Sequence, residues 1–196
     1  MKNFFIAAAA LLLLVYVFDI DWEVKRPPGI VVSDEPRQWD VSGPTWTIGR
    51  DRMTALASFS ARVLVLRTAR YFLGIESRFS PVDFAVGWGP MSDRTLLDQL
   101  SFSQGHRFLN YYPKGRGFPI PFDEINSHSA NMHMIPSSHE IHRLLLAVHR
   151  GDIVDFDGYL VEVDPKEGGS WRSSLSRTDT GAGACEIVRV EHLSIE

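Results

Sequence analysis

Cysteine is almost absent from this chain of 196 residues, which contains only Cys185. No intramolecular disulfide can form, so the fold must be stable through its hydrophobic core. The chain also lacks a surplus of basic residues, because its formal net charge is −4. Phosphate backbones are bound by basic surfaces, so nucleic acid is not expected as a partner.

Long apolar runs are absent except at the N-terminus, where all fifteen residues from 4 to 18 are apolar or Tyr. At about 1.5 Å per residue, such a helix spans about 22 Å, which is short for a hydrocarbon core of about 30 Å. The length also fits a signal-peptide core, but the run does not end in small residues suited to cleavage. We therefore expect an uncleaved transmembrane anchor at residues 1–20, with the lipid bilayer as a partner.

The charges around this run give conflicting signals about its orientation. The short N-terminal tail favours insertion with the N-terminus inside, whereas Lys25, Arg26 and Arg37 place more positive charge after the run than before it. We expect a single-pass membrane protein with an extracytoplasmic, periplasmic domain. Residues 21–46, which contain Pro and Gly among charges, are expected to form a juxtamembrane linker, and residues 47–196 a single α+β domain.

The domain is predicted to begin with helices. Residues 47–72 lack Pro, are rich in Ala, Leu and Arg, and place apolar residues near helical spacing, which predicts the longest helix. A shorter helix is expected at residues 92–102, with Ser92 as its N-cap. A third is expected after residue 137, because Ser137 and Glu140 have the spacing of a capping box.

Beyond the third helix the apolar period changes to two, which predicts strands. Residues 153–156 and 159–163 are expected to form a hairpin with a type I′ turn at Asp157 and Gly158. Further strands are expected around residues 171–175 and 186–193. The predicted fold is therefore α+β, with an N-terminal anchoring helix, then helices, then a small C-terminal antiparallel sheet.

Ser129, Met132 and Pro136, followed by Gly151-Asp152, occur in an order that resembles membrane-anchored Ser/Lys peptidases. In that family the nucleophile and the hairpin are close in sequence, and a lysine base follows on a later strand. Here a predicted helix separates them, and the only later lysine falls in a predicted turn. We therefore assign the chain to no family on this order.

Four histidines lie within a span of fifteen residues: His128, His133, His139 and His142. Neutral imidazoles bind metals well, and the neighbouring methionines would add thioether ligands suited to copper. The spacing matches no established zinc pattern such as His-Glu-x-x-His. We expect these histidines to face solvent or cap a helix, with no metal and no cofactor.

The loop at residues 173–186 places Ser, Thr and Gly residues before Cys185. A deprotonated thiol is a nucleophile, and an imidazole such as His133 can take its proton. If the domain is an enzyme, the catalytic pair is expected to be His133 and Cys185, with Asp179 or Asn131 orienting the imidazole. The alternative is that Cys185 is a small buried residue at the start of a strand.

Two further residues are candidates for substrate contact. Arg177 could hold a carboxylate through a bidentate contact, and the amides of residues 181–185 could receive an oxyanion. Trp88, between two glycines, either forms a shelf for a ligand or fills the core. The leading functional hypothesis is a membrane-anchored accessory or binding protein, whose partner is another membrane or envelope protein; the alternative is a membrane-tethered Cys/His hydrolase or transferase.

Overall fold

The computed structural model describes residues 23–176 and 185–196. Its strands are β1 (Arg37–Asp40), β2 (Thr45–Ile48), β3 (Asp51–Arg70), β4 (Val82–Gly87), β5 (Leu100–Gly105), β6 (Phe108–Pro113), β7 (Ser129–Pro136), β8 (Ile153–Asp164), β9 (Trp171–Arg172) and β10 (Glu186–Ile195). Its helices are η1 (Glu76–Arg78), η2 (Gly89–Ser92), α2 (Arg94–Leu97), α3 (Phe122–Ser127) and α4 (His139–Ala147). These helices are short, so the predicted α+β fold is wrong: the described chain is mainly β.

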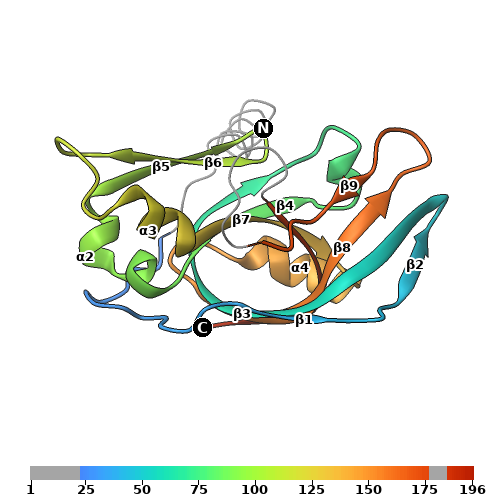
Figure 1. The fold of residues 1–196 in the computed structure, drawn as a ribbon, viewed down its shortest axis with the longest axis horizontal. Coiled ribbons are helices and arrows are strands. Elements are labelled where there is room, and N and C mark those ends of the chain that lie inside the picture. The colour runs from blue at the N-terminus through green and yellow to red at the C-terminus, as the bar shows by residue number, and fades with distance from the viewer. Residues whose placement is uncertain (1–22, 177–184) are drawn as a thin grey trace, which may run out of the picture.

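Five strands form a sheet that closes on itself. The pairing runs from β3 to β4, β7, β10 and β8, and β8 pairs again with β3. The β7–β10 pairing is parallel and the others in this ring are antiparallel. The β5–β6 hairpin is a separate sheet, which lies with α2 and α3 at one end of the molecule, while β2 and β9 lie at the other (Figure 1).

β3 replaces the long helix predicted at residues 47–72. Every second side chain from Asp51 to Val63 is buried, which is the period of a strand. Ala, Leu and Arg favour helices by only tenths of a kcal/mol, so tertiary context readily overrides them. Here β3 pairs with β1, β2, β4 and β8, and these ladders determine its conformation.

β8 runs straight through the predicted hairpin turn, so that prediction is also wrong. Gly158 pairs with Phe59 of β3 on one side and with Val190 of β10 on the other. A Cβ at Gly158 would lie 2.0 Å from the carbonyl oxygen of Arg189. Glycine is therefore required here for close approach of two backbones rather than for a turn.

The helix predicted after residue 137 is confirmed as α4, although its N-cap is Ser138 rather than Ser137. The Ser138 hydroxyl accepts a hydrogen bond from the backbone N–H of Ile141 at 3.2 Å. The helix predicted at residues 92–102 is wrong in extent, because α2 ends at Leu97 and β5 follows. Asp93, not Ser92, caps α2. The strand predicted around residues 186–193 is confirmed as β10.

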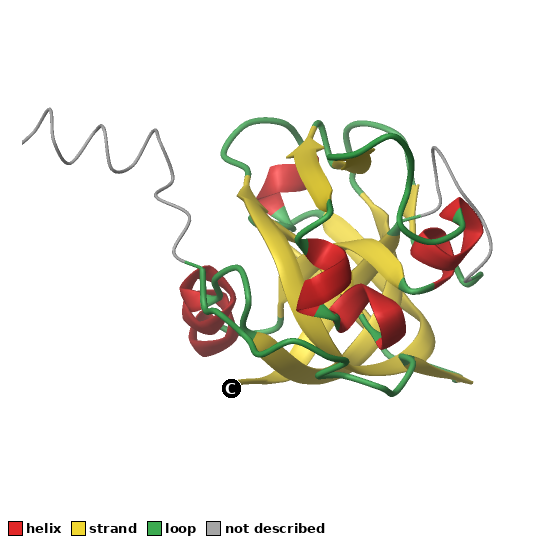
Figure 2. Cartoon of the chain, turned by 90° about the vertical axis from the view of Figure 1, so that its left-hand side faces the viewer, coloured by secondary structure: helices red, strands yellow, loops and turns green. Residues whose placement is uncertain are grey.

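The two faces of the closed sheet carry different cores. The main core contains Phe59, Phe84, Met132 and Val188 from four of the five strands, together with buried side chains of α4. Figure 2 shows the sheet curving around with the helices packed beside it. A smaller cluster, which includes Ile135, lies on the opposite face of β7 and β10. The candidate site lies on this second face.

The prediction of a single-pass membrane protein with a periplasmic domain is corrected by the structure. Among residues 23–176 and 185–196, no helix has the length and apolar character needed to cross a bilayer. The expected anchor at residues 1–20 itself lies outside the described residues. Within residues 21–46, the segment predicted as a linker, β1 pairs with residues 57–60 of β3. The division into domains stays a prediction.

Candidate functional site

Asp83 is a carboxylate without exposed surface near the start of β4. Its chain neighbours Val82 and Phe84 face the main core, whereas Asp83 shares the opposite face with its partner on β7, His133. The Oδ1 atom of Asp83 lies 2.8 Å from Nη1 of Arg107 and 2.9 Å from Nδ1 of His133. A buried carboxylate is tolerated only when it is paired, and the fold brings two cationic or hydrogen-bonding groups to one oxygen.

Arg107 reaches Asp83 from the tip of the β5–β6 hairpin. Its turn consists of His106 and Arg107 alone, and both are left-handed, with φ of 50° and 64°. This is the conformation of a type I′ turn, which Asn and Gly normally occupy. Residues other than glycine adopt it at a cost, so contacts elsewhere must hold the turn in place.

The Arg107 side chain supplies those contacts. It donates to the carbonyl oxygen of Ser80 at 3.0 Å, and the ring centroids of Tyr71 and Trp171 lie 4.3 Å and 5.3 Å from its guanidinium carbon. The Tyr71 hydroxyl accepts the backbone N–H of Arg107 at 3.1 Å. Burial, with the charge of Asp83, raises the pKa of Tyr71 to about 12. This hydroxyl is therefore protonated at neutral pH.

The backbone of Arg107 connects these groups to Cys185. Its carbonyl oxygen accepts a hydrogen bond from Nδ2 of Asn131 at 3.0 Å, and Sγ of Cys185 lies 3.8 Å from the same oxygen. Asn131 is held in turn by Gln104, whose Nε2 donates to its Oδ1 at 2.8 Å. We call Asp83, Arg107, Asn131, His133 and Cys185 the polar cluster.

The register of β7 and β10 explains why Cys185 joins the cluster. Ile187 pairs with His133 in a parallel ladder, so Cys185, two residues earlier, comes beside Asn131. Paired residues of adjacent strands point to the same side, as do alternate residues of one strand. Cys185 and His133 therefore share a face and lie two positions apart. Cys185 is partly exposed, and its carbonyl oxygen accepts the N–H of Ser174 at 3.1 Å.

The imidazole of His133 is held on two sides. Its Nδ1 is close to Asp83, although the contact is not aligned as a hydrogen bond, and its ring packs on Trp171 with centroids 5.0 Å apart. Catalytic hydrogen bonds are often loose in an unliganded site and align when substrate binds. Within the described part of the chain, Nε2 makes no hydrogen bond. An imidazole whose Nδ1 faces a carboxylate can exchange a proton through its Nε2.

Tyr111, on β6, lies near Cys185. Its hydroxyl lies 2.8 Å from Oγ of Ser129, at the start of β7. Burial raises the pKa of Tyr111 to about 12, and negative charge at the neighbouring Cys185 and Glu186 acts in the same direction. The hydroxyl therefore stays protonated at neutral pH.

The other predicted residues that the structure describes lie outside the polar cluster. Arg177 and Asp179 lie outside the described residues. Trp88 is 1% exposed within the main core and away from the polar cluster. The remaining predicted histidines lie on or next to helices: His128 follows α3, and His139 and His142 belong to α4. In residues 23–176 and 185–196, no three His, Cys, Asp or Glu side chains are arranged to hold a metal ion.

Sequence reasoning missed Asp83, Arg107 and Trp171. A signal for Asp83 exists, because it is a lone carboxylate within the apolar run at residues 82–86, where a charge must be paired. Arg107 and Trp171 carry no comparable signal. Each lies in a turn or a two-residue strand that is ordinary in sequence, and only the fold brings them to Asp83.

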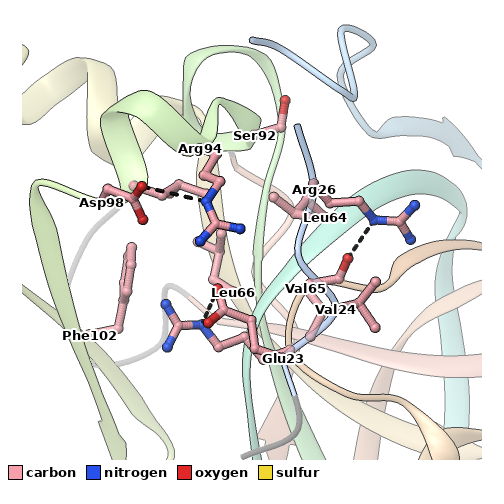
Figure 3. A pocket seen from close by; sticks show the side chains of 13 residues that line it. Glu23, Val24, Arg26, Leu64, Val65, Leu66, Ser92, Arg94, Asp98 and Phe102 are labelled. Atoms are coloured by element: carbon pink, nitrogen blue, oxygen red, sulfur yellow. Dashed lines mark hydrogen bonds and ion pairs between the residues drawn. The ribbon is translucent and has the colours of Figure 1, made fainter. Parts of the chain in front are cut away.

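A separate hollow lies beside β3 and α2, and none of the polar cluster lines it. Figure 3 shows Arg94 directed at Asp98, and their N···O distance is 3.5 Å. Arg150 pairs with Glu23 at 3.7 Å, and Arg26 donates to a backbone carbonyl at 2.8 Å. Each arginine of this hollow already has a partner, so the hollow is a weaker candidate for an anion site than its composition suggests.

The polar cluster brings a thiol, an imidazole and a carboxylate to one face of the sheet, with a guanidinium that balances the carboxylate. A thiol beside an imidazole that a third group orients is the arrangement used for nucleophilic catalysis. Comparison with known proteins gives no match among family models, curated proteins or solved structures.

Proposed function

We propose that this protein is a hydrolase or acyl transferase in which Cys185 is the nucleophile and His133 the general base. One observation carries the proposal: Oδ1 of Asp83 lies 2.9 Å from Nδ1 of His133, on the face to which β10 brings Cys185. A carboxylate at Nδ1 leaves Nε2 to exchange a proton with the nucleophile. The substrate is an ester, thioester or amide, since a thiolate attacks a carbonyl carbon.

In the first step, the thiol proton of Cys185 moves to Nε2 of His133 as Sγ bonds to the carbonyl carbon. The carbonyl oxygen takes the π electron pair; when the double bond re-forms, the leaving group departs with the proton from His133. Water, or an acceptor hydroxyl or amine in a transferase, then attacks the thioester with His133 again as base, and Cys185 is released. Asp83 stabilises the imidazolium in both steps.

Cys185 is the single cysteine, so its alkylation by iodoacetamide, followed by mass spectrometry, tests the proposal directly. We expect rapid labelling of the folded protein at neutral pH, and a fall in rate of about tenfold or more in His133→Ala. His139→Ala removes an exposed imidazole from α4 and is expected to leave the rate unchanged. A thiol that reacts only after unfolding, or equally fast in His133→Ala, refutes the proposed pair.

A non-catalytic accessory or binding protein is the second candidate. The observation that favours it is that Arg107 joins Asp83 through its side chain and Asn131 through its carbonyl oxygen, which holds the β5–β6 hairpin without any chemistry. Its partner would be another protein, since the net charge of −4 does not favour nucleic acid. Silence of Cys185 in a correctly folded protein supports this candidate over the enzyme.

A further inference from the structure

We infer that the proposed catalytic site includes an apolar pocket, which binds the apolar side group of the substrate next to its reacting carbonyl. This inference rests on the proposed function. The pocket lies between the segment that follows β3 and the turn that joins β8 to β9, and it encloses about 280 Å³ with its open mouth included. Its walls include Ile75, Phe79, Val163 and Trp171.

Trp171 connects the pocket to the polar cluster. Its indole lines the pocket, packs on the ring of His133 at 5.0 Å between centroids, and lies 5.3 Å from the guanidinium of Arg107. The chain then continues to Ser174, whose N–H donates to the carbonyl oxygen of Cys185 at 3.1 Å. One aromatic ring thus separates the pocket from the proposed base. In this proposal, a substrate whose carbonyl lies at Cys185 places a neighbouring group in the pocket, across the Trp171 ring.

The walls and the rim of the pocket determine the class of group that binds. Phe79 and Val163 are buried in the smaller core and form an apolar floor. Ile75, which lines the pocket, is 38% exposed, and Leu73, two residues earlier in the chain, is 91% exposed. Exposed apolar side chains close to one another are typical of contact sites. The ionisable residue of the lining is Glu76, which disfavours an anionic group.

The size of the pocket limits what it holds. Part of the 280 Å³ is open space at the mouth, so this pocket accommodates one side group rather than a whole ligand. The group is therefore a branched aliphatic or an aromatic one, such as the side chain of leucine or phenylalanine, attached close to the carbonyl.

Gly169 allows the pocket to be filled without strain. It lines the pocket, its φ is not positive, and a Cβ built on it meets no atom within 4 Å. Gly169→Leu therefore adds a bulky apolar side chain to the pocket lining without strain. Gly117→Leu is the matched control, because Gly117 is an exposed glycine outside the pocket with the same open surroundings.

The experiment compares the alkylation rates of Cys185 with iodoacetamide and with N-benzyl iodoacetamide. In the unmodified protein and in Gly117→Leu, we expect the benzyl reagent to alkylate Cys185 at least about ten times as fast as iodoacetamide does. Burial of one apolar group in a pocket changes a rate by about this factor. In Gly169→Leu this preference is expected to disappear while the iodoacetamide rate is kept. Equal preference in all three proteins overturns the inference and leaves the proposed function intact.

Binding can also be measured without the thiol reaction. N-Benzylacetamide, which cannot alkylate, is titrated into protein with isotope-labelled methyl groups, and the signals of Val163 and Ile75 are followed by NMR. We expect their shifts to change in the unmodified protein and in Gly117→Leu, but not in Gly169→Leu. Unchanged signals in the unmodified protein overturn the pocket, whereas shifts together with a silent Cys185 support the pocket and refute the enzyme.

Discussion

Replacing Asp83 by Asn tests the electrostatics at the centre of the polar cluster. The change keeps the shape of the side chain but removes the charge that pairs with Arg107, and the two side chains are 0% and 15% exposed. Breaking a buried ion pair from one side costs about 3–5 kcal/mol, because the partner's charge is left unpaired. A typical domain is stable by about 5–15 kcal/mol. We therefore expect the melting temperature to fall by about 6–20 °C.

A double-mutant cycle isolates the pair itself. Asp83→Asn, Arg107→Met and the double variant are unfolded in urea beside the unmodified protein, with circular dichroism as the signal. Because the double variant leaves no unpaired charge between these two positions, its destabilisation is expected to be about 2–3 kcal/mol less than the sum of the single effects.

The ion pair between Arg62 and Glu196 is a control within the same chain. Its N···O distance is 2.6 Å, but the two side chains are 40% and 63% exposed, so water screens the pair. Arg62→Met is expected to cost about 1 kcal/mol or less. If Asp83→Asn costs no more than Arg62→Met, or if the effects at positions 83 and 107 simply add, the buried pair does not anchor the hairpin.

Three further predictions concern stability. Gly158→Ala is expected to lower the free energy of unfolding by about 2 kcal/mol or more in urea, because its Cβ would meet the carbonyl oxygen of Arg189 at 2.0 Å; an equal effect of Gly117→Ala, which meets open space, would contradict this. For Tyr111, with its pKa raised to about 12, the stabilisation is complete below about pH 10, where an unfolded tyrosine ionises, and is lost as the pH rises toward 12. Tyr111→Phe is therefore expected to flatten the alkaline fall in melting temperature, and an unchanged slope would count against it. Asp93 caps α2, and hydrogen bonds led by the N–H of Gly29 hold the pKa of its carboxyl below the ordinary 3.8. The stabilisation by the Asp93 carboxylate is present above about pH 4 and is lost as the pH falls further. Asp93→Ala is therefore expected to cost about 1 kcal/mol at neutral pH and less in acid. A difference in thermal unfolding that does not change with pH would contradict this.

The proposed catalytic pair illustrates how far sequence reasoning reaches into the site. His133 and Cys185 were singled out for their chemistry, and the parallel β7–β10 ladder brings them to one face. Their roles stay predictions. The orienting groups predicted beside them were Asp179 and Asn131, whereas the carboxylate that the structure places at His133 is Asp83. That contact depends on the β4–β7 register, which no local pattern in the sequence specifies.

The sequence by itself determined the structural features that depend on interactions between residues close together in the chain. The start of α4 depends on one hydroxyl and an N–H three residues later, and β10 is rich in Ile and Val, which favour strands. Both are local, so their patterns can be recognised without knowing the fold.

The closed sheet and the polar cluster were decided only by tertiary structure. β3 carries residues with good helix propensity, and it is a strand because four other strands pair with it. Gly158 has the sequence signature of a turn, but it lies mid-strand because β3 and β10 pair with it on either side. Local preferences are worth tenths of a kcal/mol per residue. The free energy gained from burial and strand pairing over a whole sheet is much larger than these local preferences. The tertiary fold also joins residues far apart in the chain, such as Asp83 and Arg107, which are 24 positions apart.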